Sequence, residues 1–149
     1  MTYVLDTLAV LAHYFREPGQ AMVSQLIADP TADLGISAPT IYELNVRLRV
    51  IGIGYQEMLA AIETYARTFD FVAPLTEEIA STGADLRSKA TQRISAVDVM
   101  IAATAVSTGG TLAQVPQLTL RSGISTFFLN LRLASARNGL NLSHLEIAL

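Results

Sequence analysis

Short apolar runs alternate with longer segments of helical periodicity along the first 113 residues of this chain. The runs predict short strands at residues 3–5, 34–37, 71–73 and 111–113. Between the strands, apolar residues recur every three or four positions, which predicts helices at residues 8–15, 20–28, 39–49, 56–69, 77–89 and 96–107. This order is typical of an α/β fold with a mostly parallel sheet and crossover helices.

The pattern is less clear after Ala113. Residues 117–120 are interpreted as a fifth strand and residues 126–136 as an amphipathic helix, while residues 140–149 have no assignment. The chain has no internal repeat and no linker long enough to divide it. We therefore expect a single domain over residues 1–149.

Composition narrows the class of protein. A chain of 149 residues with 51% hydrophobic residues can bury one substantial core. The absence of cysteine excludes disulfides, thiolate zinc ligands and a cysteine nucleophile, and cytoplasmic localisation is the expectation. The sequence contains no candidate membrane span and does not begin with a signal peptide, so we expect no membrane association.

Charge and hydropathy say less about partners. The net charge of −3 lacks the basic surplus of a tight nucleic-acid binder, although bound divalent cations would supply positive charge where a phosphate docks. A mean hydropathy of +0.40 favours a subunit or partner interface. The apolar face of Met22, Val23, Leu26 and Ile27 is either core or interface, and we favour core.

Three acids lie where a predicted strand leads into a helix or where a helix begins. Asp6 follows the first strand, Glu43 lies soon after the second, and Asp98 opens the helix that begins near residue 96. Parallel strands direct their carboxyl ends to one edge of a sheet, where ligands bind, so we expect the three acids to converge.

Each acid also has a purely structural interpretation. Thr40-x-x-Glu43 and Ser95-x-x-Asp98 match the capping box, and Asp6 can cap the helix that follows it. Convergence of the three acids favours a metal site over simple caps, because two carboxylates about 4 Å apart repel by about 4 kcal/mol at an effective dielectric of 20. A hard divalent cation such as Mg²⁺ or Mn²⁺ offsets that repulsion.

Four stretches in this order resemble a PIN-domain ribonuclease of the VapC toxin type. They are YVLDT at residues 3–7, ISAPTIYEL at 36–44, PLTEEIA at 74–80 with ADLR at 84–87, and ISAVDVMIAATA at 94–105. The resemblance implies a three-layer α/β/α fold with four or five strands and a Mg²⁺- or Mn²⁺-dependent endoribonuclease. It also implies a homodimer, a small antitoxin as partner, and Asp6, Glu43 and Asp98 as catalytic metal ligands, with Thr7 nearby.

The chain departs from the family's pattern after Ala113. Family members carry a fourth Asp or Asn in a loop here, but Ala113 joins Gln114 directly, and no acid occurs between Asp98 and Glu146. Either the loop is deleted, or the sequence lacks a loop that the natural chain has. The segment from about residue 125 also exceeds the usual family ending, and we interpret it as a C-terminal extension.

Two hypotheses therefore remain for the function. The first is a metal-dependent endoribonuclease that acts as a toxin on RNA. The alternative is a degenerate PIN domain that no longer cleaves and binds or sequesters an antitoxin. Among the basic residues, Arg87 is the best candidate for contacting substrate phosphate, while Arg47, Arg49, Lys89 and Arg93 are interpreted chiefly as solvated helix positions.

Overall fold

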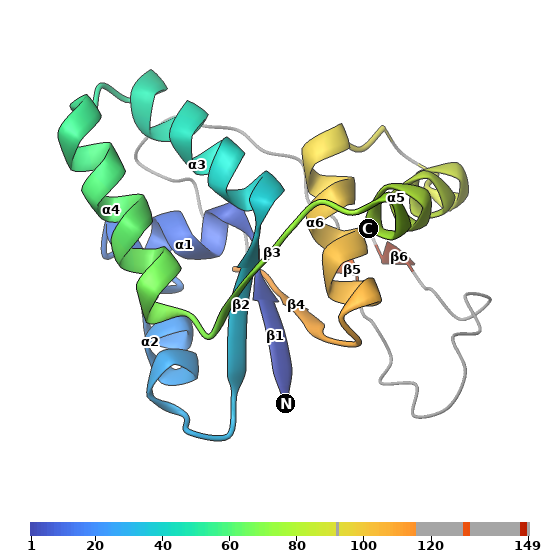
Figure 1. The fold of residues 1–149 in the computed structure, drawn as a ribbon, viewed down its shortest axis with the longest axis horizontal. Helices are drawn as coiled ribbons and strands as arrows, with labels where there is room; N and C mark the ends of the chain where they lie inside the picture. The colour runs from blue at the N-terminus through green and yellow to red at the C-terminus, as the bar shows by residue number, and fades with distance from the viewer. Residues whose placement is uncertain (92, 116–129, 132–146, 149) are drawn as a thin grey trace.

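The computed structural model describes residues 1–91, 93–115, 130–131 and 147–148 (Figure 1). In chain order, its elements are β1 (Thr2–Leu5), α1 (Thr7–Tyr14), α2 (Gln20–Ala28), β2 (Asp33–Ser37), α3 (Ala38–Val50), α4 (Tyr55–Thr68), β3 (Phe71–Ala73), α5 (Glu77–Lys89), α6 (Ala96–Ser107), β4 (Thr111–Ala113), β5 (Asn130–Leu131) and β6 (Ile147–Ala148).

The four predicted strands form one parallel sheet in the order β3-β2-β1-β4. In the register, Val4 lies beside Gly35 of β2 and Leu112 of β4. All three pairings are parallel, so every strand ends at the same edge. The predicted parallel sheet is confirmed with four strands, and the fifth strand expected at residues 117–120 lies outside the described part of the chain.

Helices cover both faces of the sheet, because successive residues of a strand point in opposite directions. Leu5 belongs to a buried cluster with residues of α1, α2, α3 and α4, whereas its neighbour Val4 packs with residues of α5 and α6. In Figure 1, α1 to α4 lie on one side of the sheet and α5 and α6 on the other. This arrangement confirms the predicted α/β/α layers.

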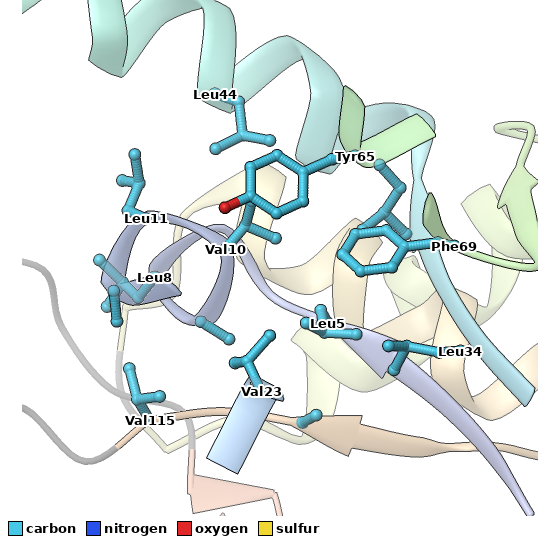
Figure 2. Packing of buried hydrophobic residues seen from close by; sticks show 14 of the residues in the cluster. Leu5, Leu8, Val10, Leu11, Val23, Leu34, Leu44, Tyr65, Phe69 and Val115 are labelled. Carbon is cyan, nitrogen blue, oxygen red and sulfur yellow. The ribbon is translucent and has the colours of Figure 1, made fainter. Parts of the chain in front are cut away.

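The larger core cluster joins the sheet to the helices that surround the candidate site. Figure 2 shows Leu5 and Leu34 of the strands gathered with Val10 of α1, Leu44 of α3 and Tyr65 of α4. Leu44 is 2% exposed and directly follows Glu43 in the sequence. Burial of Leu44 therefore fixes the rotation of α3 and, with it, the direction of Glu43.

One strand position depends on the absence of a side chain. A Cβ atom on Gly35 of β2 would lie 2.4 Å from the ring of Phe71 on β3. The Phe71 ring is partly buried against the cluster under α5 and α6. Glycine at this position therefore lets an aromatic ring pack across the sheet.

The predicted boundaries agree with the structure to within one residue for every strand and helix up to residue 113. The helix expected at residues 126–136 is wrong at Asn130 and Leu131, which form β5 and pair antiparallel with β6. The helical period of the local sequence is overridden there by hydrogen bonds to residues near the end of the chain. The rest of that predicted helix lies outside the described residues.

The apolar face of α2 is mostly core, as favoured from the sequence. Val23 is fully buried, and Met22 and Leu26 pack against the same cluster. Ile27 is 37% exposed and lies at the margin of this face. None of the described helices is long and apolar enough to cross a membrane.

Candidate metal-binding site at the carboxyl edge of the sheet

Asp6 lies at the point where the chain leaves the central strand β1. Its backbone N–H donates to the Ala113 carbonyl of β4 over 3.1 Å, and its Oδ1 accepts from the Ala9 N–H over 2.7 Å, which caps α1. The chain proceeds from β1 to β2 on one side, while β4 lies on the other side. Ligands of open α/β sheets bind at such a switch point. Asp6 therefore caps α1 and also lies where a ligand is expected to bind.

The start of α3 is fastened to the end of β1. The Ser37 hydroxyl accepts from the Thr40 N–H over 3.1 Å and lies 2.9 Å from the Thr40 hydroxyl, which in turn donates to the Leu5 carbonyl over 3.4 Å. Ser37 is therefore the N-cap, and Glu43 lies beyond the first turn. The capping-box interpretation of Glu43 is wrong, because the helix begins three residues earlier than that motif requires.

Glu43 makes one contact at the beginning of α1 and one within its own helix α3. The Thr7 hydroxyl donates to its Oε2 over 2.6 Å. Arg47, one turn further along α3, donates to Oε1 from Nε over 3.0 Å and from Nη2 over 2.6 Å. The Arg47 and Glu43 side chains are only 17% and 13% exposed. Both carboxylate oxygens of Glu43 are therefore bound by groups of the protein itself.

Asp98 occupies the first turn of α6. Ser95 caps this helix by accepting from the Asp98 N–H over 3.1 Å. A short turn joins α6 to β4, so the first turn of α6 lies at the edge where β1 and β4 end. The structural interpretation of Asp98 as part of a helix start is correct, and it does not remove Asp98 from the site.

The three acids influence one another electrostatically. Burial raises the pKa of Asp6 to about 7, hydrogen bonds from the Ala9 and Leu8 backbone oppose the rise, and the charges of Asp98 and Glu43 add to it. Burial also raises the pKa of Asp98, helped by Glu43 and opposed by the Ser95 hydrogen bond and the Arg47 charge. Asp6 is thus influenced by the charges of both other acids, and Asp98 by that of Glu43; we call these three residues the acidic cluster.

The donor chemistry of the acidic cluster fits a hard divalent cation, since it offers carboxylate oxygens in a partly buried, negatively charged setting. In the described part of the chain, however, no three Asp, Glu, His or Cys side chains are oriented to hold an ion together. Within the acidic cluster, Thr7 and Arg47 already bind the two oxygens of Glu43.

The chain enters the core directly after β4. Val115 is 4% exposed, and its Cγ1 would lie 2.4 Å from a Cβ placed on Gly19. Ala113 and Val115 are therefore both buried on either side of Gln114. Glu146 lies outside the described residues.

Two basic residues near the acids make contacts within the protein. The interpretation of Arg47 as a solvated position is wrong, because it contacts Glu43 and influences Asp98. The i,i+4 spacing of Glu43 and Arg47 was the available signal. Arg87 donates to the Ile94 carbonyl over 2.7 Å and so supports the loop before α6, while its side chain stays exposed.

A PIN domain family model matches residues 3–114 of the chain. No curated protein sequence matches it significantly. Among solved structures, VapBC2 from Rickettsia felis, bound to a promoter DNA fragment, is 17% identical with a TM-score of 0.60, covering 75% of this chain and 85% of that one. FitAcB from Neisseria gonorrhoeae is 27% identical with a TM-score of 0.59, covering 75% of this chain and 86% of that one.

A third similar structure is VapC20 from Mycobacterium tuberculosis, described as a toxin that cleaves the sarcin-ricin loop. It is 15% identical, its TM-score is 0.59, and the match covers 74% of this chain and 85% of that one. These structures share the fold described above, and the family match spans all four strands of the parallel sheet and the three acids. The chain belongs to the PIN domain family.

Proposed function

We propose that this protein is a metal-dependent endoribonuclease that hydrolyses RNA phosphodiesters and acts as the toxin of a toxin–antitoxin pair. The observation that carries the proposal is the acidic cluster at the switch point of the sheet, where burial and neighbouring charges raise the pKa of Asp6 to about 7. Membership of the PIN domain family and a fold like that of VapC20 support the same class.

Each residue of the site has a defined task in this proposal. Asp6, Asp98 and Glu43 are the catalytic residues that would hold Mg²⁺ or Mn²⁺. A bound ion supplies positive charge at the phosphate and lowers the pKa of a water. Thr7 orients Glu43 through its hydroxyl, and the exposed Arg87 at the entrance to α6 is the candidate contact to phosphate.

The decisive experiment is RNA cleavage with Mg²⁺ or Mn²⁺ by the natural chain, Asp6→Asn and Asp98→Asn. Each substitution should lower the cleavage rate at least about 100-fold, because it removes a charge that the reaction centre requires. Asp85→Asn, an equivalent change on the exposed face of α5, is the control and should retain activity. Cleavage that persists unchanged in both site variants would end the nuclease assignment.

A second candidate function is a PIN domain that binds partners without cleaving RNA. The observation that favours it is the occupied Glu43 carboxylate, together with the absence of any acid from residue 99 to residue 115. In that case the natural chain would be as inactive as Asp6→Asn in the same assay. Binding of an antitoxin would remain.

The partners follow from the proposed function. We propose a small antitoxin as the inhibitor, since the Rickettsia felis relative is a VapBC2 complex. Expression of the chain alone should arrest growth, and coexpression of the protein encoded beside it should restore growth. We also propose a cytoplasmic location, which is supported by RNA as the proposed substrate and by a sequence free of cysteine.

The proposed homodimer is supported by an exposed apolar surface. Large apolar side chains recur along α3 and continue onto α4, and all of them are at least 40% exposed: Tyr42, Val46, Val50, Tyr55 and Leu59. The spacing of the first three places them on one face of α3. We call this set the α3–α4 apolar face, and propose that a second copy covers it.

A further inference from the structure

Arg47 lies inside the acidic cluster rather than on the solvated surface of α3. Two of its guanidinium nitrogens donate to the same oxygen of Glu43, at 3.0 and 2.6 Å. Its charge also lowers the pKa of Asp98, which belongs to a different helix. A single guanidinium therefore acts on two of the three acids.

A second ion pair with the same i,i+4 spacing is much more exposed than the Arg47–Glu43 pair. Arg67 and Glu63 are also four residues apart, on α4, and their side chains are 79% and 62% exposed. Exposed pairs of this kind contribute little, because water and salt screen both charges. The Arg47–Glu43 pair is only 17% and 13% exposed, so its charges are screened much less.

The contacts of Glu43 engage both of its carboxylate oxygens. Arg47 binds Oε1 and the Thr7 hydroxyl binds Oε2. The carboxylate cannot turn toward Asp6 and Asp98 while both bonds persist. A divalent cation would in addition meet the positive charge of Arg47 at close range, and like charges repel.

We propose that Arg47 is a resident counter-ion of the acidic cluster, which holds Glu43 in place and competes with the divalent cation. Metal then binds fully only when the Arg47–Glu43 ion pair opens. Arg47 is thus a positioning residue that sets the metal affinity of the site. This inference rests on the proposed function, because it assumes that the acidic cluster binds metal.

The test is calorimetric titration of the whole chain with Mn²⁺, with Mn²⁺ electron paramagnetic resonance as a second measure of bound ion. Arg47→Gln should raise the affinity about threefold to tenfold, the range expected when a partly buried ion pair no longer competes. Arg67→Gln changes the net charge equally and should leave the affinity unchanged. Arg47→Lys keeps the charge and should stay close to the natural chain.

A double-mutant comparison tests the role of Glu43. Glu43→Gln should weaken Mn²⁺ binding about tenfold in the Arg47→Gln background and distinctly less in the natural chain, because only the released carboxylate is a full ligand. Circular dichroism of each variant verifies the fold. The proposal is overturned if Arg47→Gln binds Mn²⁺ as weakly as, or more weakly than, the natural chain.

The same titrations separate this inference from the proposed function. If Asp98→Asn abolishes Mn²⁺ binding while Arg47→Gln has no effect, the metal site stands and the role of Arg47 is refuted. If the natural chain and Arg47→Gln both bind no Mn²⁺, the inference and the metal-dependent function fail together. Tighter binding by Arg47→Gln without RNA cleavage supports the inference and refutes the nuclease.

Discussion

The Asp6 carboxyl group has two roles that shift its pKa in opposite directions. As the cap of α1 it accepts a backbone hydrogen bond from Ala9, which favours the charged form. As a member of the acidic cluster it is desolvated beside Asp98 and Glu43, which favours the neutral form. Because its pKa is about 7, Asp6 is mostly neutral below that pH, and its ionisation without a cation destabilises the fold.

This conflict predicts a pH dependence for the metal-free protein. A carboxyl group whose pKa rises from 3.8 to about 7 on folding binds more protons in the folded state. The free energy of unfolding should therefore fall as the pH increases from about 4 to about 7, by up to about 4 kcal/mol. Urea unfolding in the presence of EDTA, repeated between pH 4 and pH 7, measures this change in unfolding free energy.

Asp6→Asn is the matched variant for that measurement. The amide does not titrate, so the difference in unfolding free energy between the natural chain and the variant should change steadily between pH 4 and pH 7. A constant difference across the range would show that Asp6 ionises freely in the folded protein.

At the scale of elements, the beginning of α3 is the part of the fold on which the orientation of Glu43 depends. Ser37 and Thr40 are both fully buried, and their hydroxyl groups join the end of β2 to the end of β1. Unpaired polar groups at a buried position are costly, so this small network fixes where α3 begins.

Removing the buried cap should therefore destabilise the protein more than removing an exposed one. Ser37→Ala leaves the buried Thr40 N–H without its partner and the Thr40 hydroxyl with the Leu5 carbonyl alone, and should lower the unfolding free energy by about 2 kcal/mol. Thr76→Ala removes an equivalent bond to Ile79 at the exposed start of α5 and should cost about 1 kcal/mol. Denaturant unfolding of the two variants compares them directly, and equal losses would contradict the argument.

At the scale of the whole molecule, the buried core holds the layers together, whereas the α3–α4 apolar face bears on association with a second copy. The two buried clusters on opposite sides of the sheet hold the layers together. The α3–α4 apolar face leaves Val50 74% exposed and Tyr55 56% exposed, although apolar area of this extent favours burial against a partner. Part of this surface lies on α3, the helix that also carries Glu43 and Arg47.

The proposed homodimer leads to a prediction about mass in solution. The natural chain should behave as two copies of 16.0 kDa by light scattering at micromolar concentration, and Val50→Asp should shift it to one copy. Leu75→Asp, at a 52% exposed position before α5, introduces the same charge elsewhere and should leave the dimer intact. A monomeric natural chain, or dissociation by both variants, would contradict the placement of the interface.

The order of strands and helices up to Ala113 could be predicted from sequence because the signals are local. Alternation between short apolar runs and helical stripes reports which backbone geometry buries apolar side chains. Thr76 and Ser95 mark helix starts through bonds made three residues away. The prediction failed at Asn130 and Leu131, where the partner strand lies at residues 147–148 and leaves no local signal.

The sequence by itself determined the layered α/β architecture and which acids approach the carboxyl edge, because parallel strands impose a common direction on everything that follows them. Only the tertiary structure decided how the acids are engaged. The contacts of Glu43 with Thr7 and Arg47 depend on the rotation of α3 against α1. That rotation is fixed by the burial of residues such as Leu44 in a core drawn from several elements, which no local pattern encodes.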